Sequence, residues 1–110
     1  MATYLSQVAY TQEAWKTLIE NPQNRLEAVR PAIEKLGGKL IQGWFSFGDY
    51  DIISIIEMPD NVSAAAIAIA FAGGGACKAV KTTPLLSTAE GIEALKKAST
   101  SGYRSASAGR

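Results

Sequence analysis

The segment from Phe45 to Ile53 constrains the fold of this chain more than any other part of the sequence. Two runs of strand-forming residues, Leu40 to Phe47 and Tyr50 to Met58, flank the pair Gly48-Asp49. A glycine in the first position of a two-residue loop is typical of a type II′ turn, which connects antiparallel strands. The sequence therefore predicts a tight β-hairpin with Gly48 and Asp49 at its tip.

A two-residue loop also fixes which side chains share a face of the sheet, because successive residues of a strand point to opposite faces. The expected cross-strand pairs are Phe47 with Tyr50, Ser46 with Asp51, Phe45 with Ile52, and Trp44 with Ile53. The apolar face, which suits a position under helices, would carry Ile41, Phe45, Phe47, Tyr50, Ile52 and Ile56. The opposite, mixed face would carry Leu40, Gln42, Trp44, Ser46, Asp51, Ile53, Ile55 and Glu57.

Hydrophobic periodicity and capping residues predict the other elements. They are a strand from Thr3 to Tyr10, a short helix after Thr11, a helix from a capping box of Asn24 and Glu27 to Gly37-Gly38, a helix over Asn61 to Ala72 after Asp60, a strand from Cys77 to Leu86, and a last helix from a capping box of Ser87 and Glu90 to near Ala98. The helix over Asn61 to Ala72 is apolar on nearly every side, which favours a position between two surfaces.

The order strand, helix, strand, strand, helix, strand predicts an α+β fold. Two split βαβ units of this kind form a ferredoxin-like βαββαβ sandwich, with a four-stranded antiparallel sheet and both main helices on one face. The last helix is an addition to that plan. Residues 1–98 are expected to form a single domain, and residues 99–110, rich in Ser, Gly and Ala, a flexible or docking tail.

Composition argues against several classes of function. The net charge is +1 and the Lys and Arg residues are scattered, so we expect neither nucleic acid nor a membrane surface as a partner. The longest apolar run, Ala64 to Ala72, is far shorter than the ~20 residues that a membrane-spanning helix needs. Histidine is absent and the carboxylates are not clustered, so no metal site and no cofactor are predicted. The single Cys77 and an N-terminus without a signal-peptide pattern favour the cytoplasm.

The chain as a whole resembles the GYD domain family, small bacterial and archaeal proteins named for a Gly-x-Tyr-Asp signature. That signature is Gly48-Asp49-Tyr50-Asp51 here. The resemblance extends to Tyr10-Thr11, Leu36-Gly37-Gly38-Lys39-Leu40, Phe47, Glu57-Met58-Pro59-Asp60-Asn61, Thr82-Thr83-Pro84-Leu85-Leu86 and Tyr103-Arg104. It implies a ferredoxin-like chain of the dimeric α/β barrel type, and it implies no particular activity.

The mixed face of the hairpin offers one candidate ligand site. Gln42, Trp44, Ser46 and Asp51 would supply an amide, a stacking ring, a hydroxyl and a carboxylate on an otherwise apolar surface, as a small-molecule pocket requires. The alternative is a hydrated interface between copies of the chain, in which Asp51 bonds Ser46 or the backbone of the turn.

The same face predicts self-association. Leaving Trp44, Ile53 and Ile55 in water would forgo roughly 1.5–3 kcal/mol for each side chain. One possible cover is the sheet of a second copy, and the other is the C-terminal helix with Ile92 and Leu95. We therefore expect a homo-oligomer unless that helix folds back.

Three functions remain open. The first is a cytoplasmic homo-oligomeric module that binds a small, partly apolar molecule near Trp44. The second is an enzyme on the same scaffold, such as a cofactor-independent oxygenase or isomerase, by analogy of fold alone. The third is a structural or regulatory oligomer without a ligand. No catalytic residue is identified, since Cys77 has no histidine to serve as its base. An acidic residue with a raised pKa inside a cavity would favour the enzyme.

Overall fold

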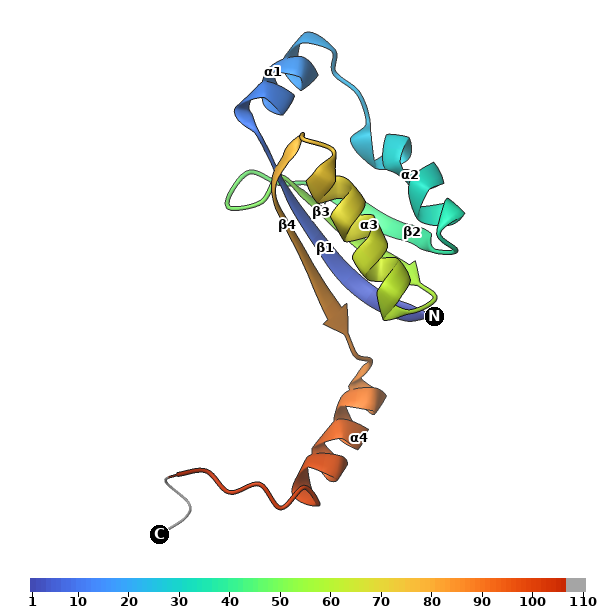
Figure 1. The fold of residues 1–110 in the computed structure, drawn as a ribbon, viewed down its shortest axis with the longest axis vertical. Helices are drawn as coiled ribbons and strands as arrows, with labels where there is room; N and C mark the ends of the chain where they lie inside the picture. Colours follow the sequence, from blue (N-terminus) through green and yellow to red (C-terminus); the bar gives the residue numbers. More distant parts are fainter. Residues whose placement is uncertain (107–110) are drawn as a thin grey trace.

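A computed structural model describes residues 1–106 of the chain and has an α+β fold. Its elements are β1 (Ala2–Tyr10), α1 (Gln12–Glu20), α2 (Arg25–Lys35), β2 (Lys39–Phe45), β3 (Ile52–Met58), α3 (Asn61–Gly73), β4 (Cys77–Leu85) and α4 (Thr88–Ser99). The strands form one four-stranded antiparallel sheet in the order β2-β3-β1-β4. Helices α1, α2 and α3 cover one face of this sheet, whereas α4 extends away from it (Figure 1).

The helices begin where the capping residues predict. Thr11 Oγ1 accepts a hydrogen bond from the backbone N–H of Ala14, and Asp60 Oδ1 accepts one from Ser63. Ser87 and Glu90 form the expected reciprocal capping box at the start of α4. The capping box predicted for Asn24 and Glu27 is only half formed, because the Glu27 carboxylate pairs with Arg30 instead. Side-chain caps therefore fix the helix starts.

The register of the hairpin is confirmed, but its turn is not of type II′. Trp44 lies opposite Ile53, and Phe45 lies opposite Ile52, as predicted. The strands end at Phe45 and resume at Ile52, so the connection is longer than two residues. Gly48 is not among the glycines with positive φ, which a type II′ turn requires at its first loop residue. Phe47 is fully exposed and does not lie on the face under the helices.

A β-bulge near the start of β2 corrects the predicted faces. Leu40 pairs with Ile56 and Gln42 pairs with Ile55, which leaves Ile41 as an extra residue in β2. Leu40, predicted on the mixed face, is therefore buried under the helices. Ile41, predicted under the helices, is half exposed. The faces from Gln42 to Phe45 agree with the alternation of the sequence.

The core lies between the sheet and the helices. Its main cluster contains Tyr4, Ile33, Leu40, Ile56, Met58, Ala64 and Ile67. The expectation that α3 lies between two surfaces is wrong for the single chain, because only its sheet side is covered. Val62 and Ile69 on its outer side are 80% and 69% exposed. The apolar composition of α3 therefore exceeds what the core of one chain uses.

The face of the sheet opposite the helices has no cover within the described chain. We call it the open sheet face; its rows are Trp44, Ile53, Gln7 and Lys81, then Gln42, Ile55, Leu5 and Thr83. Trp44 is 51% exposed there. Helix α4 does not fold back onto this face, and its Ile92 and Leu95 remain exposed. Intramolecular cover by α4 is therefore ruled out for this conformation.

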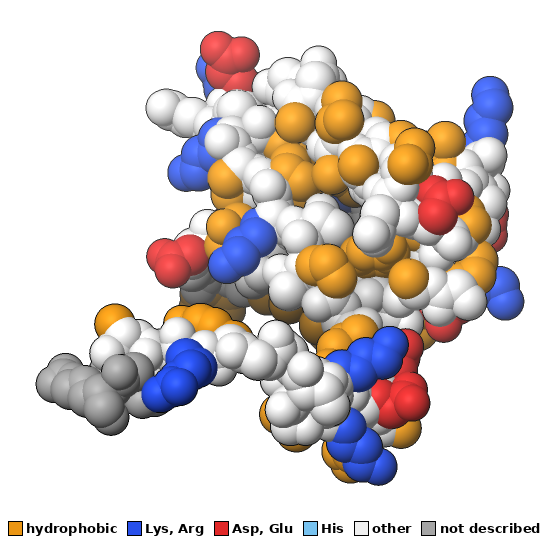
Figure 2. Space-filling view, turned by 60° about the horizontal axis from the view of Figure 1, so that its bottom comes forward, with side chains coloured by type: hydrophobic (Ala, Val, Ile, Leu, Met, Phe, Trp, Pro, Cys, Tyr) orange, Lys and Arg blue, Asp and Glu red, His pale blue; other side chains and the backbone are white. Residues whose placement is uncertain are grey.

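Other features of the surface are more ordinary. Lys, Arg, Asp and Glu side chains are scattered over the face drawn in Figure 2, with hydrophobic side chains between them. No helix in the described part of the chain is long and apolar enough to cross a membrane. Of the predicted tail 99–110, α4 includes Ser99, and residues 107–110 lie outside the described residues.

Two glycines give a matched test of the packing. A methyl group at Gly38 would meet Met58 Sδ and would lie 2.5 Å from the carbonyl oxygen of Glu57, whereas one at Gly48 would meet no atom within 4 Å. Gly38→Ala should lower the free energy of unfolding by ~1–3 kcal/mol, because the backbone must shift. Gly48→Ala should leave it unchanged or raise it slightly. Urea denaturation of both variants checks this, and equal effects would contradict the packing described.

Candidate functional site

A row of small residues crosses the helix-facing side of the sheet. Gly43, Ser54, Ser6 and Thr82 lie opposite one another on the four strands. The rows on either side of it consist of larger residues: Leu40, Ile56, Tyr4 and Pro84 on one side, and Phe45, Ile52, Val8 and Val80 on the other. The helices pack on most residues of the larger rows, and a hollow remains above the small row. The residues that support them are Tyr4, Leu40, Ile56, Val8, Ile52 and Val80.

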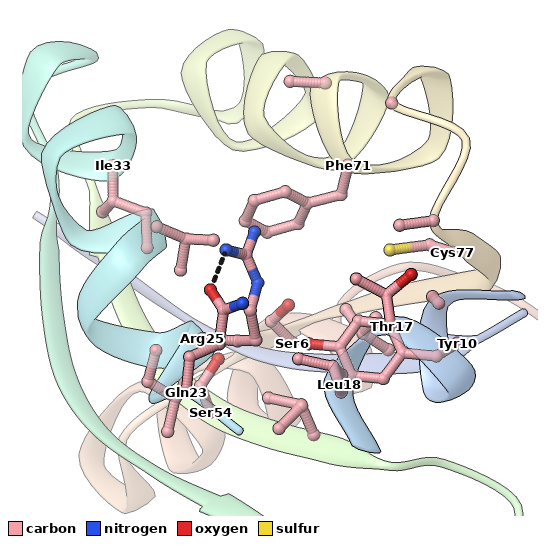
Figure 3. Close-up of a pocket in the computed structure, with 18 residues that line it drawn as sticks. Ser6, Tyr10, Thr17, Leu18, Gln23, Arg25, Ile33, Ser54, Phe71 and Cys77 are labelled. Atoms are coloured by element: carbon pink, nitrogen blue, oxygen red, sulfur yellow. Dashed lines mark hydrogen bonds between the residues drawn. The ribbon is translucent and has the colours of Figure 1, made fainter. Parts of the chain in front are cut away.

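This hollow is a cavity of about 390 Å³ between the sheet and α1, α2 and α3 (Figure 3). The residues that line it are Ser6, Val8, Tyr10, Ala14, Thr17, Leu18, Gln23, Arg25, Leu26, Val29, Ile33, Ile52, Ser54, Ala70, Phe71, Gly74, Ala76 and Cys77. Its floor is buried, and Thr17, Gln23 and Ala76 at its rim are exposed to solvent. A volume of this size is within the usual range for small-molecule sites.

Most of the cavity wall is apolar, and a few polar groups converge on it. Ser6 and Ser54 contribute hydroxyl groups from the floor, where they are 4% and 6% exposed. Tyr10 and Cys77 contribute a phenol and a thiol from the ends of β1 and β4. Arg25 contributes a guanidinium from the first turn of α2. An apolar wall with few polar groups suits a ligand of the same character.

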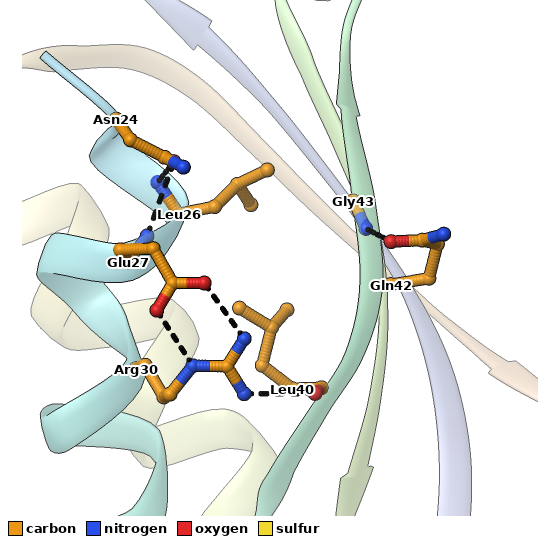
Figure 4. A network of polar contacts seen from close by, with 7 residues as sticks. All are labelled: Asn24, Leu26, Glu27, Arg30, Leu40, Gln42 and Gly43. Carbon is orange, nitrogen blue, oxygen red and sulfur yellow. Dashed lines mark hydrogen bonds and ion pairs between the residues drawn. The ribbon is translucent and has the colours of Figure 1, made fainter.

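Contacts between α2 and β2 fix the position of the helix that carries Arg25 (Figure 4). Arg30 pairs with both carboxylate oxygens of Glu27 at 2.9 Å and donates a hydrogen bond to the carbonyl of Leu40. Leu26 packs over Gly43, where any larger residue would collide with it. The Arg25 Nη1 group donates a 3.0 Å hydrogen bond to Gln23 Oε1, and Figure 3 shows the guanidinium pointing into the cavity.

Burial raises the pKa values of the phenol and the thiol at the end of the cavity, both of which are neutral at pH 7. It raises the pKa of the Tyr10 hydroxyl, and the guanidinium of Arg25 opposes this effect only in part. It also raises the pKa of the Cys77 thiol, again against the opposing charge of Arg25. The ring of Tyr10 is fixed by an edge-to-face contact with Trp15 at 5.4 Å. Tyr10 and Cys77 are therefore neutral hydrogen-bond donors, and Cys77 is a poor nucleophile.

Asp51, predicted in a ligand site, has a structural contact. Its Oδ2 atom accepts a 2.9 Å hydrogen bond from the backbone N–H of Tyr10, and its own N–H donates to the carbonyl of Val8. The pairing of β1 with β3 ends at Val8 and Ile52, so the N–H of Tyr10 beyond it bonds to a side chain. The alternative in which Asp51 bonds Ser46 through its side chain does not occur, although the backbone N–H of Ser46 donates to the carbonyl of Asp51 at 2.8 Å.

The other predicted site residues are not part of the cavity. Gln42 and Trp44 lie on the open sheet face, and Gln42 Oε1 accepts a hydrogen bond from the N–H of Gly43. Ser46 and Tyr50 are partly buried in the connection between β2 and β3, and the signature residues Gly48 and Asp49 are exposed there. A ligand site of Gln42, Trp44, Ser46 and Asp51 therefore stays a prediction.

The cavity floor was not predicted from the sequence. The sequence does contain a sign of it, because Ser6 and Ser54 occupy inward positions in strands whose other inward residues are large and apolar. No group of three or more His, Cys, Asp or Glu within residues 1–106 is arranged to hold a metal ion.

Comparison with known proteins identifies a family. A family model described as GYD domain matches residues 4–95, which confirms the resemblance noted in the sequence. No curated protein and no solved structure matches the chain.

The contact between Asp51 and Tyr10 predicts a stability difference between two aspartates of the signature. Asp51→Ala should lower the free energy of unfolding by ~1.5–3 kcal/mol, since it removes a charge-assisted hydrogen bond and leaves the N–H of Tyr10 without an acceptor. Asp49→Ala, at an exposed position two residues earlier, should change it by less than ~0.5 kcal/mol. Thermal melts of the two variants measure this difference, and a tolerant Asp51 would show that the contact is not needed.

Proposed function

This chain belongs to the GYD domain family, and we propose that it is a binding module that holds one small, largely apolar molecule in the cavity between the sheet and the helices. The observation that carries the proposal is the cavity of about 390 Å³ above the row of small residues. Leu18, Val29, Ile33 and Phe71 supply apolar contact, and the hydroxyls of the floor supply hydrogen bonds.

Binding has more support than catalysis. None of the described residues that line the cavity is Asp or Glu, so the wall offers no carboxylate as a general base. Burial raises the pKa of the Cys77 thiol, which opposes nucleophilic attack. A cofactor-independent oxygenase or isomerase is therefore the weaker alternative.

The single cysteine provides a direct test of occupancy. Cys77 lines the cavity, so a bound molecule should shield it from iodoacetamide. We expect 2-naphthalenemethanol, a neutral ring compound, to slow alkylation of Cys77 in a saturable manner, as followed by mass spectrometry. Ser54→Val should weaken this protection about tenfold, because the added methyl groups fill the floor.

Thr82→Val is the matched control for this test. Thr82 belongs to the same row but does not line the cavity, so the variant should keep full protection. Absence of protection in the natural chain, or equal protection in the Ser54→Val variant, would refute binding in the cavity.

We propose in addition that the module is a homo-oligomer, with a ferredoxin-like sheet that pairs face to face as in dimeric α/β barrels. The strand order β2-β3-β1-β4, with three helices on one face, supports this class of fold. The open sheet face supports the pairing, since Leu5, Trp44, Ile53 and Ile55 form its apolar centre. Helix α4 would then reach across to the partner. We also propose a cytoplasmic location, since one cysteine can form no internal disulfide.

Light scattering at micromolar concentration tests the assembly. We expect a dimer or a larger closed assembly, and we expect Trp44→Lys to shift it toward monomer, because the new charge would be buried at the centre of the interface. Ile69→Lys is the control, since Ile69 is an exposed apolar residue on the outer side of α3. A monomeric natural chain, or dissociation by Ile69→Lys alone, would contradict pairing through the open sheet face.

A further inference from the structure

Arg25 is a cation in the cavity wall without an acidic partner. The ion pair found within residues 1–106 joins Glu27 and Arg30, and Arg25 takes part in no such pair. Its hydrogen bond goes to a neutral amide, that of Gln23. Since the described lining contains no carboxylate, the charge of Arg25 is not balanced locally. A partly buried cation is stabilised most by an anion that contacts it in a site shielded from bulk water.

We propose that the molecule bound in this cavity is a carboxylic acid with an apolar body, and that Arg25 binds its carboxylate. The inference rests on the binding function proposed above and names its ligand class. A guanidinium has five N–H donors in a planar fork that matches the two oxygens of a carboxylate. The Nη1 group donates to Gln23 and the guanidinium also lies beside the Tyr10 hydroxyl, which leaves most of its five N–H donors available to a carboxylate.

The apolar body of such an acid has a wall to contact. Val29 and Ile33 follow Arg25 along the same helix, and Phe71 approaches from α3 (Figure 3). The buried hydroxyls of Ser6 and Ser54 lie on the floor beneath. The charge is therefore at one position in a wall that is otherwise mostly apolar. This distribution matches an acid whose ring or chain contacts the apolar side chains.

The backbone at the start of α2 does not provide this anion site. Asn24 Oδ1 already accepts hydrogen bonds from the N–H groups of Leu26 and Glu27. Those N–H groups are thus occupied by a side-chain cap, and the side chain of Arg25 is the group left to recognise an anion. The Arg25 guanidinium also lies near the Tyr10 hydroxyl, where its charge partly offsets the burial that raises the pKa of that hydroxyl. A carboxylate bound to Arg25 could therefore accept a second hydrogen bond from Tyr10.

A matched pair of probes tests the proposal in the full chain. 2-Naphthoate and 2-naphthalenemethanol share one ring system and differ in charge. Calorimetric titration at pH 7.5 should give naphthoate an affinity at least about tenfold above that of the alcohol. Arg25→Gln should remove this difference and leave the affinity for the alcohol within about twofold.

Lys35→Gln is the control variant, because it removes one positive charge from the same helix at an exposed position outside the cavity. It should leave the preference for naphthoate intact. Equal affinities of the natural chain for the two probes would overturn the inference while the binding function stands, and this comparison needs no variant to fold. An equal loss in Arg25→Gln and Lys35→Gln would also overturn it, since a general field effect would then explain the preference. If neither probe binds, the binding function fails and the inference falls with it.

Discussion

The placement of the helices depends on differences in side-chain size across one face of the sheet. Two rows of large residues support the helices, and the row of Gly43, Ser54, Ser6 and Thr82 between them does not reach them. Close packing is the rule in protein interiors, so an unfilled row is costly unless something occupies it. At the edge strand, Leu26 fills the space over Gly43. Over the two serines the space stays open, and the candidate site is that unfilled part of the core.

Much of the fold could be predicted because it depends on local rules. Alternation placed Trp44 opposite Ile53 and Phe45 opposite Ile52, and side-chain oxygens marked the helix starts at Thr11, Asn24, Asp60 and Ser87. These features involve residues a few positions apart, whose geometry the chain fixes by itself. The sheet and its helices could therefore be read from the sequence.

The predictions that were wrong or missing concern features that depend on residues far apart in the sequence. Nothing near Ile41 indicates a bulge, and the resulting exchange of Leu40 for Ile41 under the helices follows from pairing with β3. The role of Asp51 depends on the end of β1, 41 residues earlier in the chain, where the N–H of Tyr10 needs an acceptor. The cavity is lined by residues from three helices and three strands at once. Only its floor corresponds to a recognisable sequence pattern, the serines at inward positions.

Helix α4 gives the chain an element whose folding is conditional. It has twelve residues and none of them is buried. Isolated helices of up to ~12–15 residues are marginal in water, and a capping box with basic residues in the last turn adds little to that balance. The helical state of α4 is therefore not set by the domain that carries it. A surface that covered its exposed Ile92 and Leu95 side chains would add the free energy of that contact to the stability of the helix.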